Sequence, residues 1–469
     1  MNSHRENPQT DSALTVGIVG GGLAGLAAGC ALADSGYRVT LFERRPFLGG
    51  RASSYEHPGT GEVVDNCQHV LFGVCTNLIE FYERIGVGDK IRWVDDMTFV
   101  EPGGRRSKLE ATFLPPPFHT LPSFLRFPFL DAHDKFAIAR ALAVLTPAPA
   151  QDNGENFLQW MHRHGQTRNA IERFWKPVLI SALSEDLDRV SVSAAGQVVR
   201  ETMKSKAARR MGIPAIPLTQ LYNAAQEYIT SRGGDVRLRS SVEAMHPEAD
   251  SSALSITGSV SQFAFVVLAL PFFSLANVLP QNGASQPLRN QIEHFESSPI
   301  TGIHLWFDRQ ITDLEHAVLL DRTIQWMFHK SKLLGRNSEG SYIELVVSSS
   351  KDLIAKSKQE IVEMALAEVR EFFPEARSAN LLKSTVIKEV NATYSPRPGI
   401  DRERPRSQTA WPRVFLAGDW TATGWPATME GAVRSGYLAA DAVLQAAGQT
   451  HKSFLVPDLP AAGFMKLFP

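Results

Sequence analysis

The sequence predicts an α/β protein in which a discontinuous, Rossmann-like nucleotide-binding domain is joined to a second domain of mixed sheet and helix. Three observations predict this fold. A strand, a glycine-rich turn, a helix and a second strand open the chain. Another strand, followed by Gly-Asp, lies more than 360 residues later, and between the two, apolar runs of strand length alternate with helical segments.

The composition excludes several classes of protein. The chain has 469 residues, and 48 Lys and Arg against 49 Asp and Glu leave a formal net charge of −1, whereas nucleic-acid-binding proteins normally carry a basic excess. The three cysteines, Cys30, Cys67 and Cys75, form no CxxC pair. We therefore expect neither a disulfide framework nor a metal site, and we expect a reducing compartment, the cytoplasm.

The opening unit has the complete pattern of a dinucleotide-binding βαβ unit. The apolar run LTVGIV predicts the first strand, an alanine-rich stretch predicts the helix, and RVTLF predicts the second strand. These elements are expected at residues 14–19, 23–33 and 38–42. A GxGxxG turn joins the first strand to the helix, and an acidic residue follows the second strand.

Each residue type in this unit has a physical reason. Gly20 permits the tight turn, Gly22 lets the backbone approach a pyrophosphate, and Gly25 allows the helix to pack closely on the strand. The helix start offers free N–H groups and the positive end of its dipole to phosphates. Glu43, 18 positions after Gly25, can accept hydrogen bonds from ribose hydroxyls and would repel a 2′-phosphate. The unit therefore predicts FAD or NAD rather than NADP.

The residues after Glu43 favour FAD. They read RRPFLGGRAS, and the position of GGR resembles that in the superfamily of flavin-dependent amine oxidases and carotenoid desaturases. The resemblance implies that Gly49 and Gly50 pass close to the cofactor and that Arg51 contacts it near the pyrophosphate. Arg44, the first basic residue after the acid, is a further candidate for cofactor contact.

The C-terminal region resembles the second flavin signature of the same superfamily. A buried strand, VFLA, leads into Gly418 and Asp419, and a helix begins near Met429. The resemblance implies that Asp419 binds the ribityl or pyrophosphate part of FAD and that backbone N–H groups near Met429 meet the flavin pyrimidine. Asp419 could instead be an ordinary helix cap. No cysteine follows Cys75, so we expect FAD to be bound non-covalently.

A third piece of the FAD-binding domain is expected in the middle of the chain. Residues 235–239 and the run FAFVVLAL at 263–270 read as strands, and Val242 lies where the superfamily places a backbone contact to adenine. We assign to the FAD-binding domain 1–80, 215–280 and 405–450, to an amine-oxidase-like substrate domain 81–214 and 281–404, and to an apolar tail 451–469.

The substrate domain is expected to contain helices and one sheet. Residues 131–145 and 192–210 read as helices, and three apolar or alternating runs read as strands, at 302–308, 324–330 and 341–348. His304 and Trp306 lie on one face of this sheet, toward the expected cavity, where packing is a commoner role than catalysis.

Four stretches narrow the resemblance. DNCQHV, GIHLWFDR, NATY and AGDWTATGWPATMEGAVRSG together resemble the bacterial hydroxysqualene dehydroxylases over most of the chain, with departures at Cys67, Val390 and Asn391. This resemblance implies a C30 isoprenoid alcohol as substrate. Its allylic hydroxyl would leave as water while reduced flavin delivers hydride from N5, and squalene, a hopanoid precursor, would form.

Such a reaction needs an acid. We nominate His69, with Asp65 as a neighbouring carboxylate that would raise the pKa of His69, or as an alternative donor. The external electron donor is not identified, because the chain has no second GxGxxG.

Two other functions stay open. One is an FAD-dependent desaturase of phytoene or another carotenoid, and the other is a prenyl-lipid-binding relative without redox function. The intact glycine turn, Glu43, Arg51 and Asp419 count against the second. An amine oxidase is disfavoured, because no cysteine lies near the C-terminal signature.

Two apolar segments indicate peripheral contact with a membrane, at the inner face of the cytoplasmic membrane, where a long isoprenoid lipid would enter. Residues 113–130 (FLPPPFHTLPSFLRFPFL) have Arg126 as their only charged residue and contain five prolines, which exclude a regular helix. The tail, 453–469, is also rich in Phe and Leu. Packing under loops is an equal alternative for both segments, and no run of 18 apolar residues predicts a spanning helix.

Overall fold

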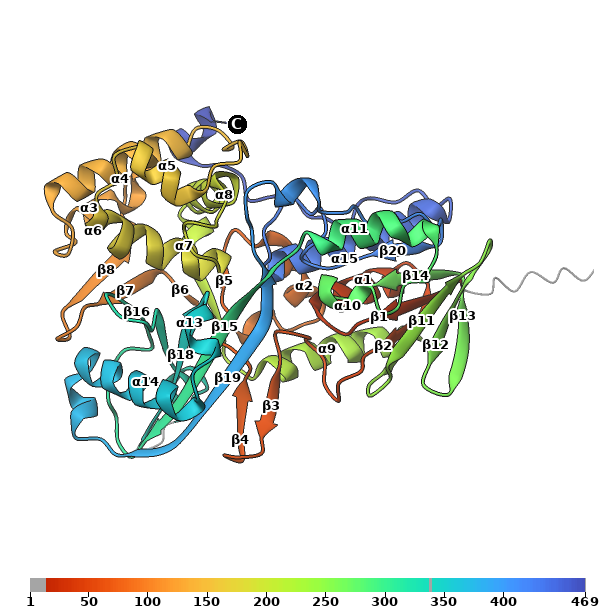
Figure 1. Ribbon diagram of the computed structural model, residues 1–469, viewed down its shortest axis with the longest axis horizontal. Coiled ribbons are helices and arrows are strands. Elements are labelled where there is room, and N and C mark those ends of the chain that lie inside the picture. Colours follow the sequence, from red (N-terminus) through yellow and green to blue (C-terminus); the bar gives the residue numbers. More distant parts are fainter. Residues whose placement is uncertain (1–13, 337–339, 469) are drawn as a thin grey trace, which may run out of the picture.

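A parallel five-stranded sheet forms the centre of one half of the molecule in the computed structural model, which describes residues 14–336 and 340–468 (Figure 1). The strand order is β10-β2-β1-β14-β20. The strands are β1 (Thr15–Val19), β2 (Arg38–Phe42), β10 (Asp235–Arg237), β14 (Phe265–Leu268) and β20 (Val414–Leu416). The sheet thus takes strands from all three stretches predicted for FAD binding, although the domain boundaries themselves stay a prediction.

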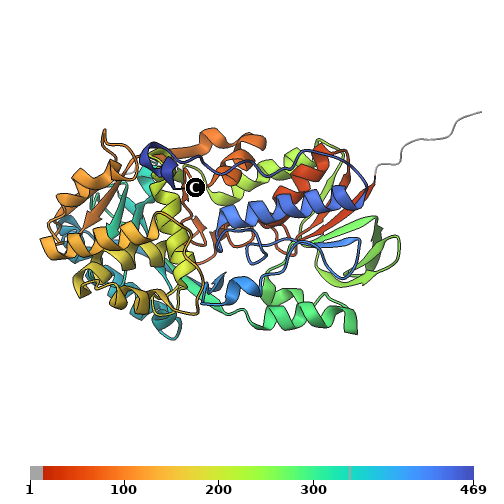
Figure 2. The ribbon, with the colours of Figure 1, turned by 90° about the horizontal axis from the view of Figure 1, so that it is seen from above.

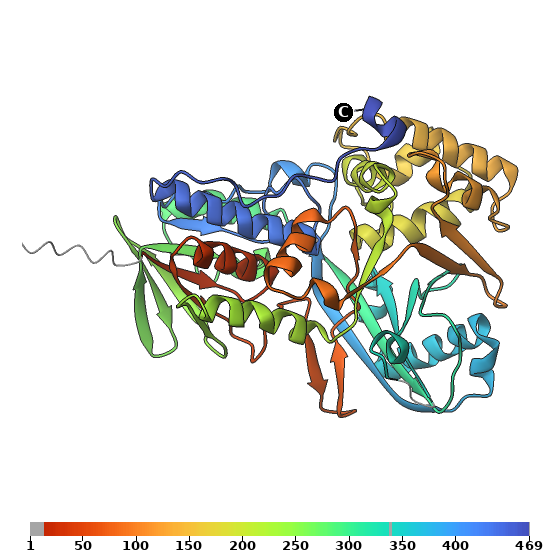
Figure 3. The same cartoon turned by 180° about the vertical axis from the view of Figure 1, so that it is seen from behind.

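Three helices cover one face of this sheet (Figure 3). They are α1 (Leu23–Asp34), α9 (Leu218–Thr230) and α15 (Met429–Ala446). The contact between α1 and α15 depends on a glycine, because a Cβ at Gly436 would lie 2.3 Å from the carbonyl oxygen of Ala24. The helix α2 (Thr76–Arg84) adds Leu78 and Phe81 to the same apolar cluster.

A small antiparallel sheet covers the opposite face. It consists of β11 (Val242–Pro247), β12 (Ser252–Ile256) and β13 (Ser259–Phe263), and Leu254 and Phe263 pack against Val266 and Leu268 of β14. The short helices α10 (Phe272–Leu275) and α11 (Gln286–Glu293) follow. The parallel strands are therefore buried on both faces, which explains why the sequence shows them as continuous apolar runs.

The second half is built on a seven-stranded sheet with the order β19-β15-β18-β17-β16-β7-β8. The strands are β7 (Asp96–Val100), β8 (Arg106–Glu110), β15 (Ser297–Phe307), β16 (His316–Leu319), β17 (Trp326–His329), β18 (Ser341–Ser348) and β19 (Leu381–Tyr394). One face packs on α14 (Lys358–Phe372). The long strands β15 and β19 run from this sheet toward the half that contains the parallel sheet (Figure 1).

Helices cover the other face of the seven-stranded sheet. They are α3 (Leu121–Leu125), α4 (Ala132–Leu145), α5 (Phe157–Arg163), α6 (Arg168–Ala170), α7 (Lys176–Leu183) and α8 (Val192–Met203). The helix predicted at 192–210 ends at Met203, and a 3₁₀ turn follows at Ala207–Arg209. Two short pieces, α12 (Lys330–Leu333) and α13 (Lys351–Ile354), flank β18.

Two small pairings complete the fold. A hairpin is formed by β3 (Ser54–His57) and β4 (Glu62–Asp65), and a three-stranded sheet by β5 (Leu71–Phe72), β6 (Ile91–Val94) and β9 (Met211–Pro214).

The proline-rich segment differs from the prediction. It contains a 3₁₀ turn at Phe118–Thr120 and the one-turn helix α3, although the five prolines were expected to exclude a regular helix. The reason is the position of Pro122 in the first turn of α3, where a helix needs no N–H donor from that residue. None of the described helices is both long and apolar enough to cross a bilayer.

Candidate active site

The glycine turn and the GGR stretch lie against each other. Gly22 and Gly49 form a parallel β-bridge, and the Gly49 N–H donates to the carbonyl oxygen of Gly21 at 2.9 Å. A Cβ at Gly22 would meet only the Cα of Gly50, at 3.8 Å. The backbone at Gly22 is therefore open to a ligand, as a pyrophosphate site requires.

The other two glycines of the turn are closely packed. A Cβ at Gly25 would lie 2.0 Å from the carbonyl oxygen of Gly20, and a Cβ at Gly20 would lie 2.4 Å from that of Ala269. Gly20 also has φ +111°, a conformation that other residues rarely adopt. These contacts fix the turn at the start of α1.

Glu43 holds the turn from the side. Its buried carboxylate accepts the N–H groups of Gly21 and Arg45, both at 2.8 Å, and the Arg45 guanidinium donates to the carbonyl oxygen of Gly50 at 2.9 Å. A carboxylate has about four lone-pair positions, so Glu43 can still accept from a ribose. Arg44 is exposed, and Arg45, which the sequence prediction missed, makes the structural contact instead.

The segment before Val242 reaches the same end of the sheet. The Ser240 N–H donates to the Glu43 carbonyl oxygen at 2.9 Å. Val242, the first residue of β11, comes two positions after Ser240 in the chain. The structure thus places Val242 near the acid that closes the βαβ unit.

The two predicted flavin signatures are joined by an ion pair. Arg51 Nη2 lies 2.6 Å from Asp419 Oδ1, and Arg51 Nη1 donates to the carbonyl oxygen of Ala392 at 2.9 Å. Asp419 is therefore not a helix cap: the cap of α15 is Thr428, whose hydroxyl accepts the Gly431 N–H at 3.1 Å.

The residues around Asp419 are held by a buried arginine that sequence reasoning missed. Arg404 donates to the carbonyl oxygens of Asp419 at 3.2 Å and Thr421 at 2.5 Å, and to the hydroxyl of Thr423 at 3.1 Å. Gly418 has φ +150° and leaves no room for a Cβ, which would lie 2.5 Å from Trp420 Nε1. The only sign of Arg404 in the sequence was an arginine-rich stretch just before β20, and such stretches more often lie on a solvated surface.

The start of α15 faces aromatic hydroxyls. The sulfur of Met429 lies 3.7 Å from the Tyr222 hydroxyl and 4.0 Å from that of Tyr82, and those two hydroxyls are 3.1 Å apart. The glycine turn, Arg51, Asp419 and the start of α15 thus lie at one end of the parallel sheet. Open backbone at Gly22, helix N-termini and a cation beside an acid together fit a flavin dinucleotide.

A family model decides the assignment: the model of flavin-containing amine oxidoreductases matches residues 23–444. The chain belongs to the flavin-containing amine oxidoreductase family. This oxidoreductase is an FAD-dependent enzyme, as the two flavin signatures predicted.

The curated relatives of the oxidoreductase correct the narrower resemblance. It is 28% identical over 460 residues to the 15-cis-phytoene desaturase of Synechococcus elongatus, covering 92% of this chain and 96% of that protein. It is 28% identical to the zeta-carotene desaturase of Synechocystis sp., covering 92% and 97%. The expected relationship to hydroxysqualene dehydroxylases is therefore wrong. The longest of the stretches used for it carries Gly418, Asp419 and Met429 of the predicted cofactor site, and cofactor contacts do not distinguish substrates within a superfamily.

Solved structures confirm the amine-oxidase-like fold. An engineered triple mutant of a putrescine oxidase superposes with a TM-score of 0.71 at 16% identity, covering 92% of this chain and 99% of the other. An oxidoreductase from Methanosarcina mazei superposes with a TM-score of 0.70 at 17% identity, covering 90% and 99%.

Asp65 and His69 do not interact as predicted. The Asp65 carboxylate contacts Lys330 Nζ at 2.6 Å, the Ser54 hydroxyl at 2.5 Å and the Leu218 N–H at 3.3 Å. His69 Nδ1 instead lies 2.7 Å from the carbonyl oxygen of Cys67. Burial lowers the pKa of His69 overall and outweighs the bond to Cys67 and the charge of Asp65, which both raise it. At neutral pH this imidazole is a base, not an acid.

Lys330 is the main residue of this site that sequence reasoning missed. Its buried ammonium contacts Asp65, the Gln68 amide oxygen at 2.8 Å and Glu344 Oε2 at 3.5 Å. Burial alone would raise the pKa of Asp65, but the Lys330 cation and the hydrogen bonds lower it overall. Burial raises the pKa of Glu344 to about 8. Only the folded chain shows this cluster, because Asp65 and Lys330 are 265 positions apart.

An apolar cluster begins at the loop that carries His69. Cys67 packs in one group with Phe99, Phe127, Trp326 and Val346, which lie between the seven-stranded sheet and the helices over it. His304 is buried on that side and donates or accepts a hydrogen bond with the Tyr342 hydroxyl at 2.9 Å. The cluster provides the apolar surroundings expected beside the flavin.

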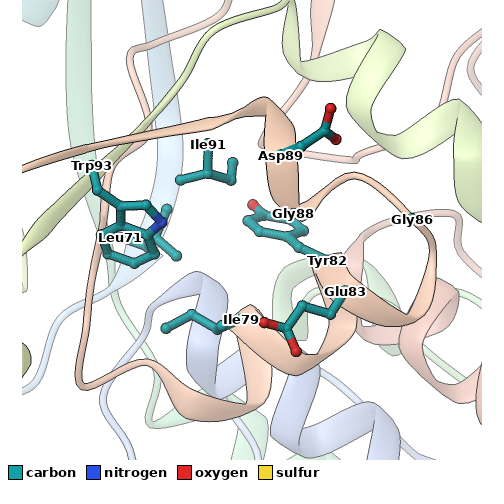
Figure 4. Close-up of a pocket in the computed structure, with 9 residues that line it drawn as sticks. All are labelled: Leu71, Ile79, Tyr82, Glu83, Gly86, Gly88, Asp89, Ile91 and Trp93. Carbon is teal, nitrogen blue, oxygen red and sulfur yellow. The ribbon is translucent and has the colours of Figure 1, made fainter.

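Two described cavities, each of about 380 Å³, lie elsewhere. Figure 4 shows the first, between α2 and β6, which is lined by Tyr82, Ile91 and Trp93 together with the acids Glu83 and Asp89. Neither cavity is lined by residues of the 65–69 loop or by Asp419 and Met429.

Proposed function

We propose that this oxidoreductase is a desaturase of a long isoprenoid of the carotenoid class. The similarity to phytoene and zeta-carotene desaturases over nearly the whole length of both chains carries this proposal. The apolar cluster beside the loop that carries His69 supports it, because a hydrocarbon substrate offers no charge for recognition and must be held by burial. Bound FAD would supply the acceptor for the hydride that leaves one substrate carbon.

His69 is the residue that fits the accompanying proton transfer. A carbonyl oxygen only accepts hydrogen bonds, so the contact with Cys67 fixes the proton on His69 Nδ1 and leaves the lone pair on Nε2. The lowered pKa of the ring keeps it neutral at pH 7. Desaturation removes a hydride from one carbon and a proton from its neighbour, and Nε2 of His69 would accept that proton.

The residues of the cofactor site have separate tasks. Gly22 and the starts of α1 and α15 would hold the phosphates and the pyrimidine edge of FAD, and Glu43 would accept from the ribose. Arg51 and Asp419 would lie beside the cofactor as a pair, so that each charge compensates the other. The proposed location is the cytoplasmic face of a membrane, because the substrate is a lipid. The redox partner stays open.

Product analysis tests the proposal. Purified FAD-loaded enzyme is mixed with 15-cis-phytoene in detergent micelles without oxygen, and we expect the flavin absorbance to bleach as a new double bond appears in the product spectrum. Replacement of His69 by Ala should slow this reaction at least about a hundredfold, the usual contribution of a general base, while FAD stays bound. No bleaching with phytoene, together with turnover of hydroxysqualene by the reduced enzyme, would overturn the proposal.

A further inference from the structure

Exposed apolar side chains gather on two segments that are far apart in sequence. Of the exposed large hydrophobic residues in the described chain, six belong to residues 113–125 and 464–467. They are Phe113 (88% exposed), Leu467 (71%), Leu125 (54%), Phe464 (50%), Phe118 (48%) and Leu121 (37%). Together they are named the tail surface here. Soluble proteins rarely expose such groups together without a partner.

The tail is seated on the proline-rich segment by specific contacts. The Phe464 N–H donates to the carbonyl oxygen of Pro116 at 2.9 Å, and the rings of Phe118 and Phe464 meet edge to face at 6.0 Å. Met465 is buried, while its neighbours Phe464 and Leu467 stay exposed. The tail therefore has an anchored inner side and an apolar outer side.

The path of the chain brings the tail to this place. After α15 ends in the FAD-binding half, the chain returns toward the other half (Figure 2). It is fixed on the way by a hydrogen bond from the Val456 N–H to Asn77 Oδ1 at 3.0 Å, an ion pair between Arg434 and Asp458, and a bond from the Ala462 N–H to the Lys204 carbonyl oxygen at 2.9 Å. Because the tail is fixed at these three points, its exposed side chains are held in place.

The charged side chains within the two segments are basic. Residues 111–130 and 459–468 contain Arg126 and Lys466, both exposed, whereas the exposed acids Glu110, Asp131 and Asp458 lie just outside these ranges, Asp458 paired with Arg434. Burial lowers the pKa of His119 in the first segment, and the nearby cations Arg209 and Lys206 lower it further; Lys206 is also exposed. Phe and Leu side chains with basic residues among them are typical of surfaces that bind anionic membrane interfaces.

The tail surface lies at the outer end of the apolar cluster. Phe124 and Phe127 follow directly in the same segment, are buried, and pack in the group that also contains Cys67. Phe127 stacks on Phe129 with ring centroids 4.7 Å apart. Continuous apolar packing thus extends from the tail surface to the loop that carries His69.

We propose that the tail surface docks the enzyme on the interface of an anionic lipid bilayer. The exposed Phe and Leu side chains enter the headgroup and acyl boundary, and Arg126, Lys206 and Lys466 lie at the anionic headgroups. This inference rests on the proposed function in one respect only: the docked surface would give a lipid substrate a route into the apolar cluster. Docking itself requires no reaction.

Vesicle flotation tests the docking. The full-length FAD-loaded protein is mixed with vesicles of phosphatidylcholine, with or without phosphatidylglycerol. The variant Phe113→Ser/Leu467→Ser should bind anionic vesicles at least about tenfold more weakly than the wild type, since two large apolar groups are lost. The matched control Val260→Ser/Leu382→Ser changes side chains of similar exposure, 66% and 63%, on β13 and β19, and should bind within about twofold of the wild type.

A charge variant separates the two components of binding. Arg126→Gln/Lys466→Gln should lower the affinity for anionic vesicles about fivefold per residue and leave the weak binding to phosphatidylcholine unchanged. The substituted side chains are all exposed, so the variants should fold, and retained FAD absorbance checks that they do.

Three results would overturn the docking proposal. In the first, the wild type does not float with anionic vesicles. In the second, the variant Phe113→Ser/Leu467→Ser floats as well as the wild type. In the third, light scattering shows an oligomer that only this variant dissociates, so that the tail surface holds copies of the chain together instead. Failure of the proposed function looks different. In that case the wild type floats and the variant does not, but neither oxidises phytoene, in vesicles or in detergent.

Discussion

At the scale of single residues, the hydrogen bond of His69 decides its chemistry. The sequence suggested an acid with a carboxylate partner, but Asp65 contacts Lys330 and the imidazole contacts a backbone carbonyl. With its pKa lowered by burial, His69 titrates below the ordinary value of 6.5. The same ring that was nominated to donate a proton is thus suited to accept one.

The pH dependence of turnover tests this assignment. Because the neutral imidazole is the active form, kcat/KM for phytoene should fall on the acid side with a midpoint below pH 6.5, and should be constant from about one pH unit above that midpoint. His69→Gln should remove this acid limb together with most of the activity. An acid limb that persists in the variant, or activity that rises as the ring is protonated, would assign the proton transfer to another group.

Glu344 gives a second pH effect at this scale, on stability. The unfolded chain loses the Glu344 proton near pH 4.5, whereas the folded protein keeps it to about pH 8, because burial raises the pKa. Between these values the folded state binds more protons, so stability falls as pH rises, by at most about 1.4 kcal/mol per pH unit. The loss is complete above about pH 8.

The variant Glu344→Gln should not show this fall. The thermal midpoints of wild type and variant, measured with FAD bound between pH 5 and 9, should move apart as pH rises, with the variant the more stable of the two at pH 8. Parallel curves would mean that Glu344 is ionised in the folded protein.

At the scale of elements, the pairing of α1 with α15 brings the two ends of the cofactor site together. Both helices begin at a flavin signature, and their close contact requires Gly436, where a side chain would collide with the backbone of α1 at Ala24. The strand positions could be predicted, because buried parallel strands are continuous apolar runs. The contact of the two helices could not be predicted, because the sequence around Gly436 looks like that of any helix in which a glycine has no packing role.

Gly436→Ala tests this packing. The added methyl group would lie 2.3 Å from the Ala24 carbonyl oxygen, so the helices must move apart at a cost of about 1–3 kcal/mol. We expect a lower thermal midpoint and weaker FAD retention, measured by ultrafiltration. The control Gly283→Ala, at a position with free space and no positive φ, should change neither by more than about 0.5 kcal/mol.

At the scale of the whole molecule, a buried ion pair connects the two halves. Lys330, just after β17 of the seven-stranded sheet, reaches Asp65 at the end of β4, whereas Arg51 and Asp419 join the two signatures within one half. A buried pair contributes little when intact compared with the cost of leaving one charge alone. The pair of Lys330 and Asp65 therefore fixes how the halves fit rather than how stable each half is.

Lys330→Met should destabilise the protein by about 3–5 kcal/mol, because Asp65 is left buried without its cation. Adding Asp65→Asn to this variant should recover part of the loss. As a control, Lys383→Met removes a surface pair with Glu62 at 2.8 Å and should cost less than about 1 kcal/mol. Urea denaturation of the wild type, the single variants Lys330→Met, Asp65→Asn and Lys383→Met, and the double variant measures these differences. An additive double variant would mean that Asp65 and Lys330 are not coupled.

The sequence by itself determined the nucleotide-binding unit, the flavin cofactor and the amine-oxidase-like fold. Glycine turns, strand runs and the acid after β2 are local patterns that one physical task imposes on neighbouring residues. Only the tertiary structure decided which charges meet. Lys330 meets Asp65 across 265 positions and Arg51 meets Asp419 across 368, and partners brought together by folding leave no local pattern. The environment of His69, on which the proposed direction of proton transfer depends, is of this kind.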